Sequence, residues 1–464
     1  MKRAPQIILI IYFLFLFCFQ INAQNKKPNI VFILADDLGY GDLGCYGSTK
    51  IYTPNIDALA KAGTKFAQFY AGSTVCAPSR AALMTGLHTG HTTIRGNGEV
   101  PLSTTDSILP QYLHKAGYKN GIVGKWGLGQ FGTTGVPENK GWDFFAGLLH
   151  HVEGHFQKPD SAWKFINGKS AKVKIPEGQY SNEWFTNQAK IFIKEQQSNP
   201  FFLYLAYTLP HAELVVPNTN MQTYLTPEGL SKFSPEKAHP SGQHYGPQNN
   251  PKAAYAAMVS QMDQYVGQII AYLKEQKLYD NTIIIFTSDN GTHKEGGRTN
   301  QDISFFNSSG GLRGAKRDLY EGGIRIPFIV SWKGKIKPAS SNEFIGALCD
   351  IVPTINEIAG VKTANQTDGI SFVNALQGKK QVNHNLLYWE FYEGGFKQAI
   401  LQNNWKAIRF YKGKTPIRTE LFDLSADKGE TINIADENEP KVKLLEALMD
   451  KERTTSTNPL FQIK

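Results

Sequence analysis

Polar side chains follow four apolar segments that the sequence predicts as buried strands. The segments cover residues 29–35, 118–123, 201–207 and 282–287, and the polar residues beyond them are Asp36, Asp37, Lys125, His211, Asp289 and Asn290. Ligands of open parallel sheets bind beyond the carboxyl ends of the strands, so groups distant in sequence can converge there. A solvated turn is the alternative for each segment taken alone.

Asp36 and Asp37 are adjacent carboxylates at the end of a strand predicted to be buried on both faces. Their mutual repulsion is costly unless a cation or a proton relieves it. With Asp289 and the amide oxygen of Asn290 they form an all-oxygen set of ligands. Such a set suits calcium or magnesium better than zinc.

Cys76 begins a segment that reads Cys-Ala-Pro-Ser-Arg, and residues 81–86 continue it as a short predicted helix. A helix N-terminus favours negative charge, and Arg80 follows one turn later, so the segment predicts an anion site. A cysteine packed near a turn is the alternative interpretation. Lysine and histidine side chains around a bound cation would hold an oxyanion with several negative oxygens, which fits both phosphate and sulfate esters.

The charged N-terminus precedes an apolar run that is shorter than a membrane span. Lys2 and Arg3 are followed by apolar residues 7–19 and then by Ala23 and Gln24, which is the order of a secretory signal. A membrane-spanning helix needs about 20 apolar residues, and no later segment reaches that length. We therefore expect a cleaved signal peptide over residues 1–23 and an exported protein, with the periplasm favoured over secretion or the cell surface.

Three cysteines are left once the predicted signal peptide is removed: Cys45, Cys76 and Cys349. An odd number does not make a disulfide framework. A single bridge between Cys45 and Cys349 would leave Cys76 as the odd thiol. The formal net charge of +9 suits an anionic partner but does not identify it.

The apolar strands alternate with predicted helices, which is typical of an α/β protein. Helices are expected over residues 107–116, 182–196, 253–276 and 351–359, and a further strand over 327–330. We predict a catalytic domain over residues 24–370 with a large mixed, mostly parallel sheet flanked by helices. Its polar segment 215–251 is expected to form a long surface loop that faces the substrate.

From about residue 370 the pattern changes to short aromatic strands. They are expected over residues 386–391, 397–401, 405–411 and 420–424, and a helix follows over 440–449. We predict a smaller C-terminal unit over residues 371–464, made of an antiparallel sheet and a helix.

The motifs, in their order along the chain, resemble those of the formylglycine-dependent sulfatases of the alkaline phosphatase superfamily. Cys-Ala-Pro-Ser-Arg at 76–80 with Thr-Gly at 85–86 is the signature of that family. The other matching segments are Ala-Asp-Asp-Leu-Gly at 35–39, Gly-Lys-Trp at 124–126, Pro-His at 210–211, Ser-Asp-Asn-Gly at 288–291, and Gly-Ala-Lys-Arg at 314–317 before Glu-Gly-Gly at 321–323. The resemblance extends from about residue 28 to residue 424 and implies an alkaline-phosphatase-like sulfatase fold.

The resemblance implies that a formylglycine-generating maturation enzyme oxidises Cys76 to formylglycine, or 3-oxoalanine. The hydrated aldehyde has two hydroxyls, of which one attacks sulfur and displaces the alcohol. The other then expels sulfate and restores the aldehyde. One calcium ion per subunit is implied, bound by residue 76 together with Asp36, Asp37, Asp289 and Asn290.

The same resemblance implies roles for the basic residues. Arg80 would fix and polarise the diol, while Lys125 and Lys316 would hold sulfate oxygens. His211 is the candidate for protonating the leaving oxygen, with Lys316 as the other possibility.

Gly127 departs from the pattern of many relatives, which have histidine at this position. A branch of bacterial polysaccharide sulfatases shares the Lys-Trp-Gly-Leu-Gly segment and places a histidine in the following loop. By this resemblance we assign the role to His155, with His151 as the fallback. His293 is a further candidate for lining the site, and a structural role is its alternative.

The sequence thus predicts an exported sulfatase that hydrolyses sulfate esters of an algal or host carbohydrate. The expected partners are a sulfated saccharide and the maturation enzyme, and not nucleic acid. One alternative is a phosphoester or phosphonate hydrolase of the same superfamily, against which the Cys76 motif argues. The other is an inactive protein that binds sulfated glycans, which requires Cys76 to stay a thiol.

Overall fold

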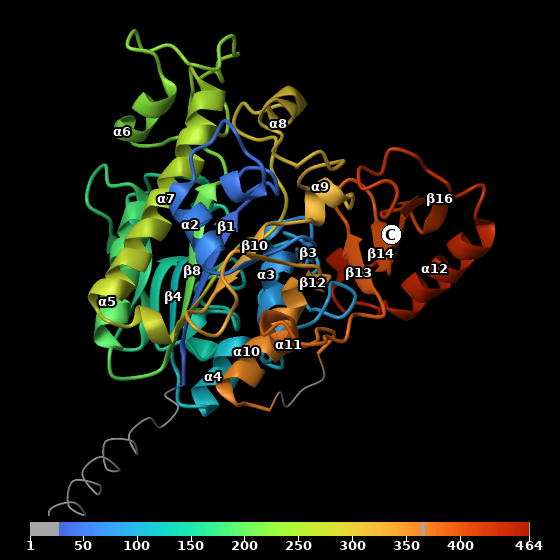
Figure 1. Ribbon diagram of the computed structural model, residues 1–464, viewed down its shortest axis with the longest axis horizontal. Helices are drawn as coiled ribbons and strands as arrows, with labels where there is room; N and C mark the ends of the chain where they lie inside the picture. Colours follow the sequence, from blue (N-terminus) through green and yellow to red (C-terminus); the bar gives the residue numbers. More distant parts are fainter. Residues whose placement is uncertain (1–26, 363–366, 464) are drawn as a thin grey trace, which may run out of the picture.

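A ten-stranded sheet runs through the centre of the computed structural model, which describes residues 27–362 and 367–463. Its strand order is β11-β2-β10-β9-β1-β8-β4-β5-β6-β7, and its strands β10, β1, β8 and β4 are labelled in Figure 1. The five central strands are parallel: β9 (Thr282–Ser288), β1 (Asn29–Asp36), β8 (Phe201–Pro210), β4 (Lys119–Lys125) and β5 (Phe144–Leu148). The signal peptide predicted over residues 1–23 lies outside the described residues.

The outer strands make the sheet mixed, as the sequence predicts. On one side β10 (Phe328–Ser331) pairs antiparallel with β9, and β2 (Thr64–Phe66) and β11 (Ser340–Asn342) follow. On the other side β6 (Ser161–Ile166) and β7 (Lys169–Lys174) continue from β5 as an antiparallel hairpin. A separate two-stranded ribbon joins β3 (Phe69–Tyr70) to β12 (Gly346–Ala347).

Helices cover both faces of the sheet, so the central strands are buried on both sides. Side chains of β1 alternate between two cores: Val31 and Ile33 pack on one face, and Ile30, Phe32 and Leu34 on the other. The first face is covered by α2 (Pro54–Ala62), α5 (Ser181–Glu195) and α7 (Pro251–Glu275), and the second by α3 (Cys76–Thr85), α4 (Leu109–Lys115) and α10 (Ile351–Ala359). This packing explains why the strands are continuous apolar runs.

Short helices lie in the connections between these elements: α6 (Asn218–Met221), α8 (Asn300–Phe306), α9 (Glu321–Ile324) and α11 (Val373–Leu376). Within residues 27–362 and 367–463, no helix combines the length and apolar character needed to cross a bilayer.

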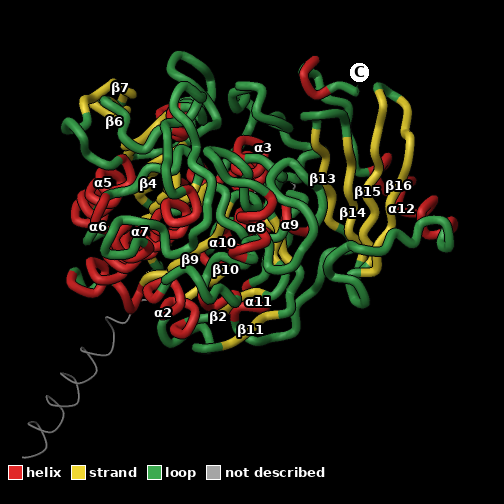
Figure 2. Tube along the Cα trace, turned by 90° about the horizontal axis from the view of Figure 1, so that it is seen from above, coloured by secondary structure: helices red, strands yellow, loops and turns green. Residues whose placement is uncertain are grey.

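The C-terminal part forms its own antiparallel sheet, as predicted. Its strands lie in sequence order beside one another (Figure 2): β13 (Leu387–Phe391), β14 (Lys397–Gln402), β15 (Trp405–Lys412) and β16 (Thr415–Asp423), with α12 (Glu439–Lys451) packed against them. Strand β16 begins at Thr415, before the predicted residue 420. Its first four residues are exposed and carry no apolar pattern from which a strand could be predicted.

The disulfide considered between Cys45 and Cys349 does not form, because both thiols are free. Cys45 is half-buried beside Asp57, where its backbone N–H donates to the carboxylate at 2.7 Å. Cys349 is buried in a different cluster, packed with side chains of the C-terminal sheet. Sequence spacing alone could not exclude the bridge, because the distance between the two cysteines is set by the tertiary fold.

A buried ion-pair triad joins the C-terminal sheet to α9 and, through it, to the ribbon strand β3. Lys406 of β15 has no exposed side-chain surface, and its Nζ lies 2.9 Å from Glu321 Oε1 and 2.8 Å from Glu430 Oε1. Glu321 belongs to α9 and also accepts a hydrogen bond from Tyr70 Oη at 2.9 Å. Burial raises the pKa of Glu430 to about 7. Lys406 therefore contacts both carboxylates at this junction, and Arg325 Nη1 adds a second cation 3.3 Å from Glu321 Oε2.

Replacing Lys406 with methionine should lower the free energy of unfolding by about 3–5 kcal/mol, because the buried carboxylate of Glu430 loses its cation and that of Glu321 keeps only Arg325. Urea denaturation measures the change. Lys443→Met is the matched control: its ammonium pairs with Glu439 on the exposed surface of α12, and its loss should cost less than about 1 kcal/mol. Equal effects of the two substitutions would show that the triad does not fasten the C-terminal sheet.

Candidate functional site

The register of the parallel strands brings the predicted polar residues together. Asp36 pairs with Pro210 across β1 and β8, and Ala35 pairs with Ser288 across β1 and β9. His211 and Asp289 are therefore the next residues beyond the same edge. Lys125 ends β4 on the other side of β8. The predicted convergence is confirmed, and all of these side chains are buried.

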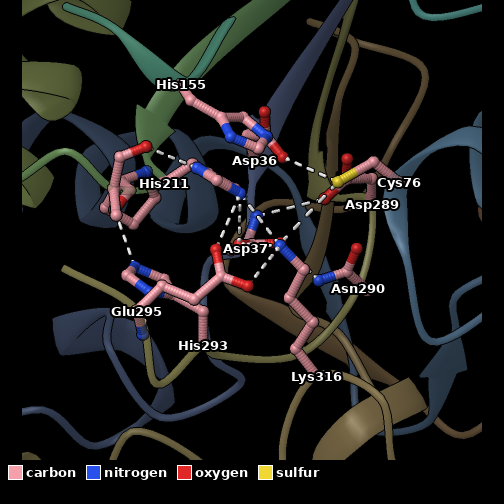
Figure 3. A network of polar contacts seen from close by, with 12 residues as sticks. Asp36, Asp37, Cys76, His155, His211, Asp289, Asn290, His293, Glu295 and Lys316 are labelled. Carbon is pink, nitrogen blue, oxygen red and sulfur yellow. Dashed lines mark hydrogen bonds and ion pairs between the residues drawn. The ribbon is translucent and has the colours of Figure 1, made fainter. Parts of the chain in front are cut away.

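Helix α3 begins at Cys76 and carries its thiol into this cluster. Sγ lies 3.3 Å from Asp36 Oδ1, 3.6 Å from Lys125 Nζ and 4.0 Å from Asp37 Oδ1 (Figure 3). Burial raises the pKa of Cys76 well above its usual value, and the charge of Asp36 raises it further. The helix start therefore does not produce a thiolate here, because burial and the charge of Asp36 outweigh the short helix dipole.

Arg80 lies one turn along α3 and clamps the opposite side of the cluster. Its Nε and Nη2 donate to Asp289 Oδ2 at 3.0 and 2.9 Å, and Nη1 donates to the backbone oxygen of Lys125 at 2.6 Å. Nη2 also lies 3.5 Å from Asp36 Oδ2. The guanidinium has no exposed surface, so its charge compensates the carboxylates around Cys76.

Each carboxylate of the adjacent pair has its own lysine. Lys125 Nζ lies 2.6 Å from Asp36 Oδ2, and Lys316 Nζ lies 2.7 Å from Asp37 Oδ2. Lys316 comes from the loop between β9 and β10 and Lys125 from the end of β4, so residues from both sides of β1 meet here. The cations thus compensate a buried negative cluster that would otherwise be strongly unfavourable.

His211 is neutral and presents Nε2 to Lys316. Its Nδ1 lies 2.6 Å from the backbone oxygen of Ala212, which selects the tautomer protonated at Nδ1. Nε2 then accepts from Lys316 Nζ at 2.9 Å. Burial lowers the pKa of His211 to about 3, and the Lys316 charge contributes to the same shift.

Asn290 offers an unused acceptor to a metal ion. Its Nδ2 donates to Asp37 Oδ1 at 2.6 Å, while its Oδ1 is buried and has no hydrogen-bond partner within the described residues. Ligand atoms of Asp36, Asp37, Cys76 and His211 lie within 4.8 Å of one another. An orphaned buried oxygen beside carboxylates fits a hard cation such as calcium or magnesium.

The loop after β5 brings two histidines to the cluster. The His155 ring stacks on the His211 ring with 4.3 Å between the ring centres, and His155 Nδ1 lies 3.3 Å from Tyr245 Oη. His151 lies beside the backbone of Gly127, because a Cβ on that glycine would be 3.7 Å from the Cβ of His151. Burial lowers the pKa of His155 strongly and that of His151 to about 4, so both rings are neutral.

His293 has a structural role in the described cluster. Its Nε2 lies 3.0 Å from the backbone oxygen of Pro210, and its Nδ1 accepts the backbone N–H of Glu295 at 3.1 Å. Both ring nitrogens are therefore occupied by backbone groups. The ring ties the loop after β9 to the end of β8.

Glu295 and Tyr245 are site residues that the sequence patterns did not single out. Glu295 Oε2 lies 3.3 Å from His211 Nε2, and Tyr245 Oη donates to the same carboxylate oxygen at 3.1 Å. Tyr245 belongs to the polar segment 215–251, so that segment does reach the site as expected. Glu295 follows β9 at a distance of several residues, where only its position beyond a strand end could have drawn attention to it.

Comparison with known proteins places this geometry in a family. The Sulfatase family model matches residues 28–361, and the model for the C-terminal part of N-sulphoglucosamine sulphohydrolase matches residues 314–456. An N-acetylgalactosamine-6-O-sulfatase from Bacteroides thetaiotaomicron is 29% identical over 93% of this chain and 94% of its own. Arylsulfatase A from Bos taurus is 30% identical over 89% of this chain and 84% of its own.

Solved structures agree with the sequence relatives. Ps i-CgsB in complex with k-i-k-neocarrahexaose has a TM-score of 0.74 and 28% identity, covering 92% of each chain. A family model that spans most of the chain, relatives of similar length and the shared fold all point the same way. The chain belongs to the sulfatase family and is a sulfuric ester hydrolase.

Proposed function

We propose that this protein is an exported sulfatase that removes sulfate from a sulfated carbohydrate through formylglycine at position 76 and one calcium ion. The observation that carries the proposal is the position of Cys76, whose Sγ lies 3.3 Å from Asp36 Oδ1 and 3.6 Å from Lys125 Nζ. A side chain placed between a carboxylate pair and a lysine suits a nucleophile that attacks an anionic ester. The carbohydrate substrate is proposed from one relative named as a galactosamine sulfatase and one solved with a neocarrahexaose.

Calcium would be held by Asp36, Asp37, Asp289 and Asn290 together with the modified residue 76. The unpartnered Oδ1 of Asn290 supports this assignment. Bound there, the ion would supply Lewis-acid polarisation of the attacking hydroxyl and compensation of the carboxylates. Arg80 keeps Asp289 oriented through its two contacts with Oδ2.

Formylglycine would supply a hydrated aldehyde with one hydroxyl to attack sulfur and a second to expel sulfate. Lys125 and Lys316 are proposed to hold the sulfate oxygens. Their ammonium groups contact Asp36 and Asp37 at 2.6 and 2.7 Å, and that of Lys125 lies 3.6 Å from the sulfur of residue 76. Charge-assisted bonds from two lysines favour the growing negative charge of the transition state.

The leaving alcohol needs a proton, and two groups stand side by side to provide it. Lys316 Nζ carries protons and donates to His211 Nε2 at 2.9 Å. His211, neutral and protonated at Nδ1, accepts this hydrogen bond at Nε2 and orients the ammonium. Lys316, which holds the proton, is therefore proposed as the donor to the leaving oxygen in preference to His211. His155 is proposed as a positioning residue, because its ring stacks on His211 at 4.3 Å and limits the rotation of that imidazole.

Calcium binding is expected to stabilise the protein and to depend on Asn290. Thermal melting at increasing calcium concentration should show a rising melting temperature, and Asn290→Ala should need at least about tenfold more calcium for the same shift. Asn404→Ala, in the exposed turn between β14 and β15, is the matched control. A larger shift with zinc than with calcium would contradict the oxygen-rich metal site.

Peptide mass spectrometry of active protein should find formylglycine in place of Cys76, with the sulfur replaced by oxygen and two hydrogens lost, so that the side chain is an aldehyde. Cys76→Ala should fold and lose sulfate release from a panel of sulfated saccharides by several orders of magnitude. Cys45→Ala, at a half-buried thiol beside Asp57, should keep its activity.

An intact thiol at position 76 in fully active protein would overturn the formylglycine mechanism. An intact thiol in protein that binds sulfated saccharides without hydrolysing them would favour the glycan-binding alternative. Preferential release of phosphate over sulfate would favour a phosphoester hydrolase.

A further inference from the structure

Glu295 faces the leaving-group side of the proposed site with unused hydrogen-bonding capacity. Oε1 accepts from Arg317 Nη1 at 2.6 Å and Oε2 accepts from Tyr245 Oη at 3.1 Å. The contacts toward the centre are longer: 3.6 Å from Oε1 to Lys316 Nζ and 3.3 Å from Oε2 to His211 Nε2 (Figure 3). A carboxylate has about four acceptor positions, so each oxygen can take one further donor.

The loop that carries Glu295 is held rigidly. The backbone N–H of Glu295 donates to His293 Nδ1 at 3.1 Å, and its backbone oxygen accepts the Arg298 N–H at 3.3 Å. Arg298 Nη1 donates to the His293 oxygen at 2.9 Å, and the guanidinium lies 3.4 Å from the centre of the Tyr255 ring. The carboxylate is therefore pre-organised for a partner and loses little entropy on binding one.

Glu295 is ionised and can only accept hydrogen bonds. Burial alone would favour the neutral acid, but the charge of Lys316 and the hydrogen bond from Arg317 hold the pKa of this carboxyl well below its usual range. A second anion, such as another sulfate or a carboxylate of the substrate, would be repelled here. A hydroxyl or amide N–H of the sugar is the complementary group.

We propose that Glu295 is a specificity-determining residue that accepts a hydrogen bond from a neutral hydroxyl or amide N–H on the sugar that bears the sulfate. This inference rests on the proposed sulfatase function and adds the class of group recognised next to the scissile bond. Arg317 supports the carboxylate from the outside, because its Nε also contacts Glu393 of the β13–β14 hairpin at 3.1 Å. Glu393 is half-exposed, and Arg317 lies between it and Glu295.

Two substrates separate sugar recognition from sulfate chemistry. A sulfated saccharide that the wild-type protein hydrolyses offers hydroxyls beside the sulfate, whereas 4-nitrophenyl sulfate offers none. Glu295→Gln should lower kcat/KM for the saccharide by about 10- to 150-fold, the range for a hydrogen bond to a charged group. Turnover of 4-nitrophenyl sulfate reports any effect that the substitution has through Lys316 and His211, so the loss on the saccharide should exceed the loss on 4-nitrophenyl sulfate by at least about tenfold. Glu393→Gln is the matched control and should leave both substrates within about threefold.

An equal loss on both substrates would overturn the proposal, because it would mean that Glu295 acts only through Lys316 or His211. Unchanged saccharide turnover in both Glu295→Gln and Glu295→Ala would overturn it as well. If the wild-type protein releases sulfate from neither substrate, the sulfatase mechanism fails separately. The hydrogen bond is then tested by calorimetric binding of the saccharide to wild type and Glu295→Gln: weaker binding to the variant supports it, and equal affinities reject it.

Discussion

The structure depends on the compensation of three carboxylates that are buried together and have no exposed surface. Asp36, Asp37 and Asp289 lie in one cluster, and isolated buried charges of this kind would be strongly unfavourable. Arg80, Lys125 and Lys316 balance them one for one within the described site. A bound calcium ion would then add two positive charges. That excess matches a sulfate ester on arrival and sulfate dianion on departure better than it matches a neutral ligand.

The sheet topology makes this concentration of charge possible. Parallel strands direct their carboxyl ends to one edge, and β1 sits between β8 and β9, so a single strand places Asp36 and Asp37 next to residues from both neighbours. Asp37 adopts a left-handed backbone with φ of 66°, an uncommon conformation for a residue other than glycine. The turn sends the two carboxylates toward different lysines, which relieves part of their repulsion.

Site residues that directly follow a strand could be predicted from the sequence, whereas site residues in irregular loops could not. Asp36, Asp289 and Lys125 follow apolar runs, so their convergence is predictable from topology alone. Tyr245, Glu295 and Arg317 come from irregular loops, and no periodic pattern marks which side chains of a loop turn inward. The roles of His293 and of the two cysteines considered for a disulfide depend on neighbours in space, which one sequence does not reveal.

The segment between β9 and β10 connects the C-terminal sheet to the residues of the candidate site. The backbone N–H groups of Lys316 and Arg317 donate to Thr292 and Thr74 at 2.8 and 3.1 Å, which anchors them to the loop after β9 and to the residues just before Cys76. A few residues later, Glu321 receives Lys406 from the C-terminal sheet.

The same sheet contributes Trp389, whose Nε1 donates to the backbone oxygen of Ala71 at 2.8 Å, and Glu393, which holds Arg317. Val75, immediately before Cys76, packs in the cluster that includes Trp389. The C-terminal sheet therefore forms part of the wall that positions residues 76 and 316. The contacts that attach the C-terminal sheet to the rest of the protein therefore also help to set the geometry of the charge cluster.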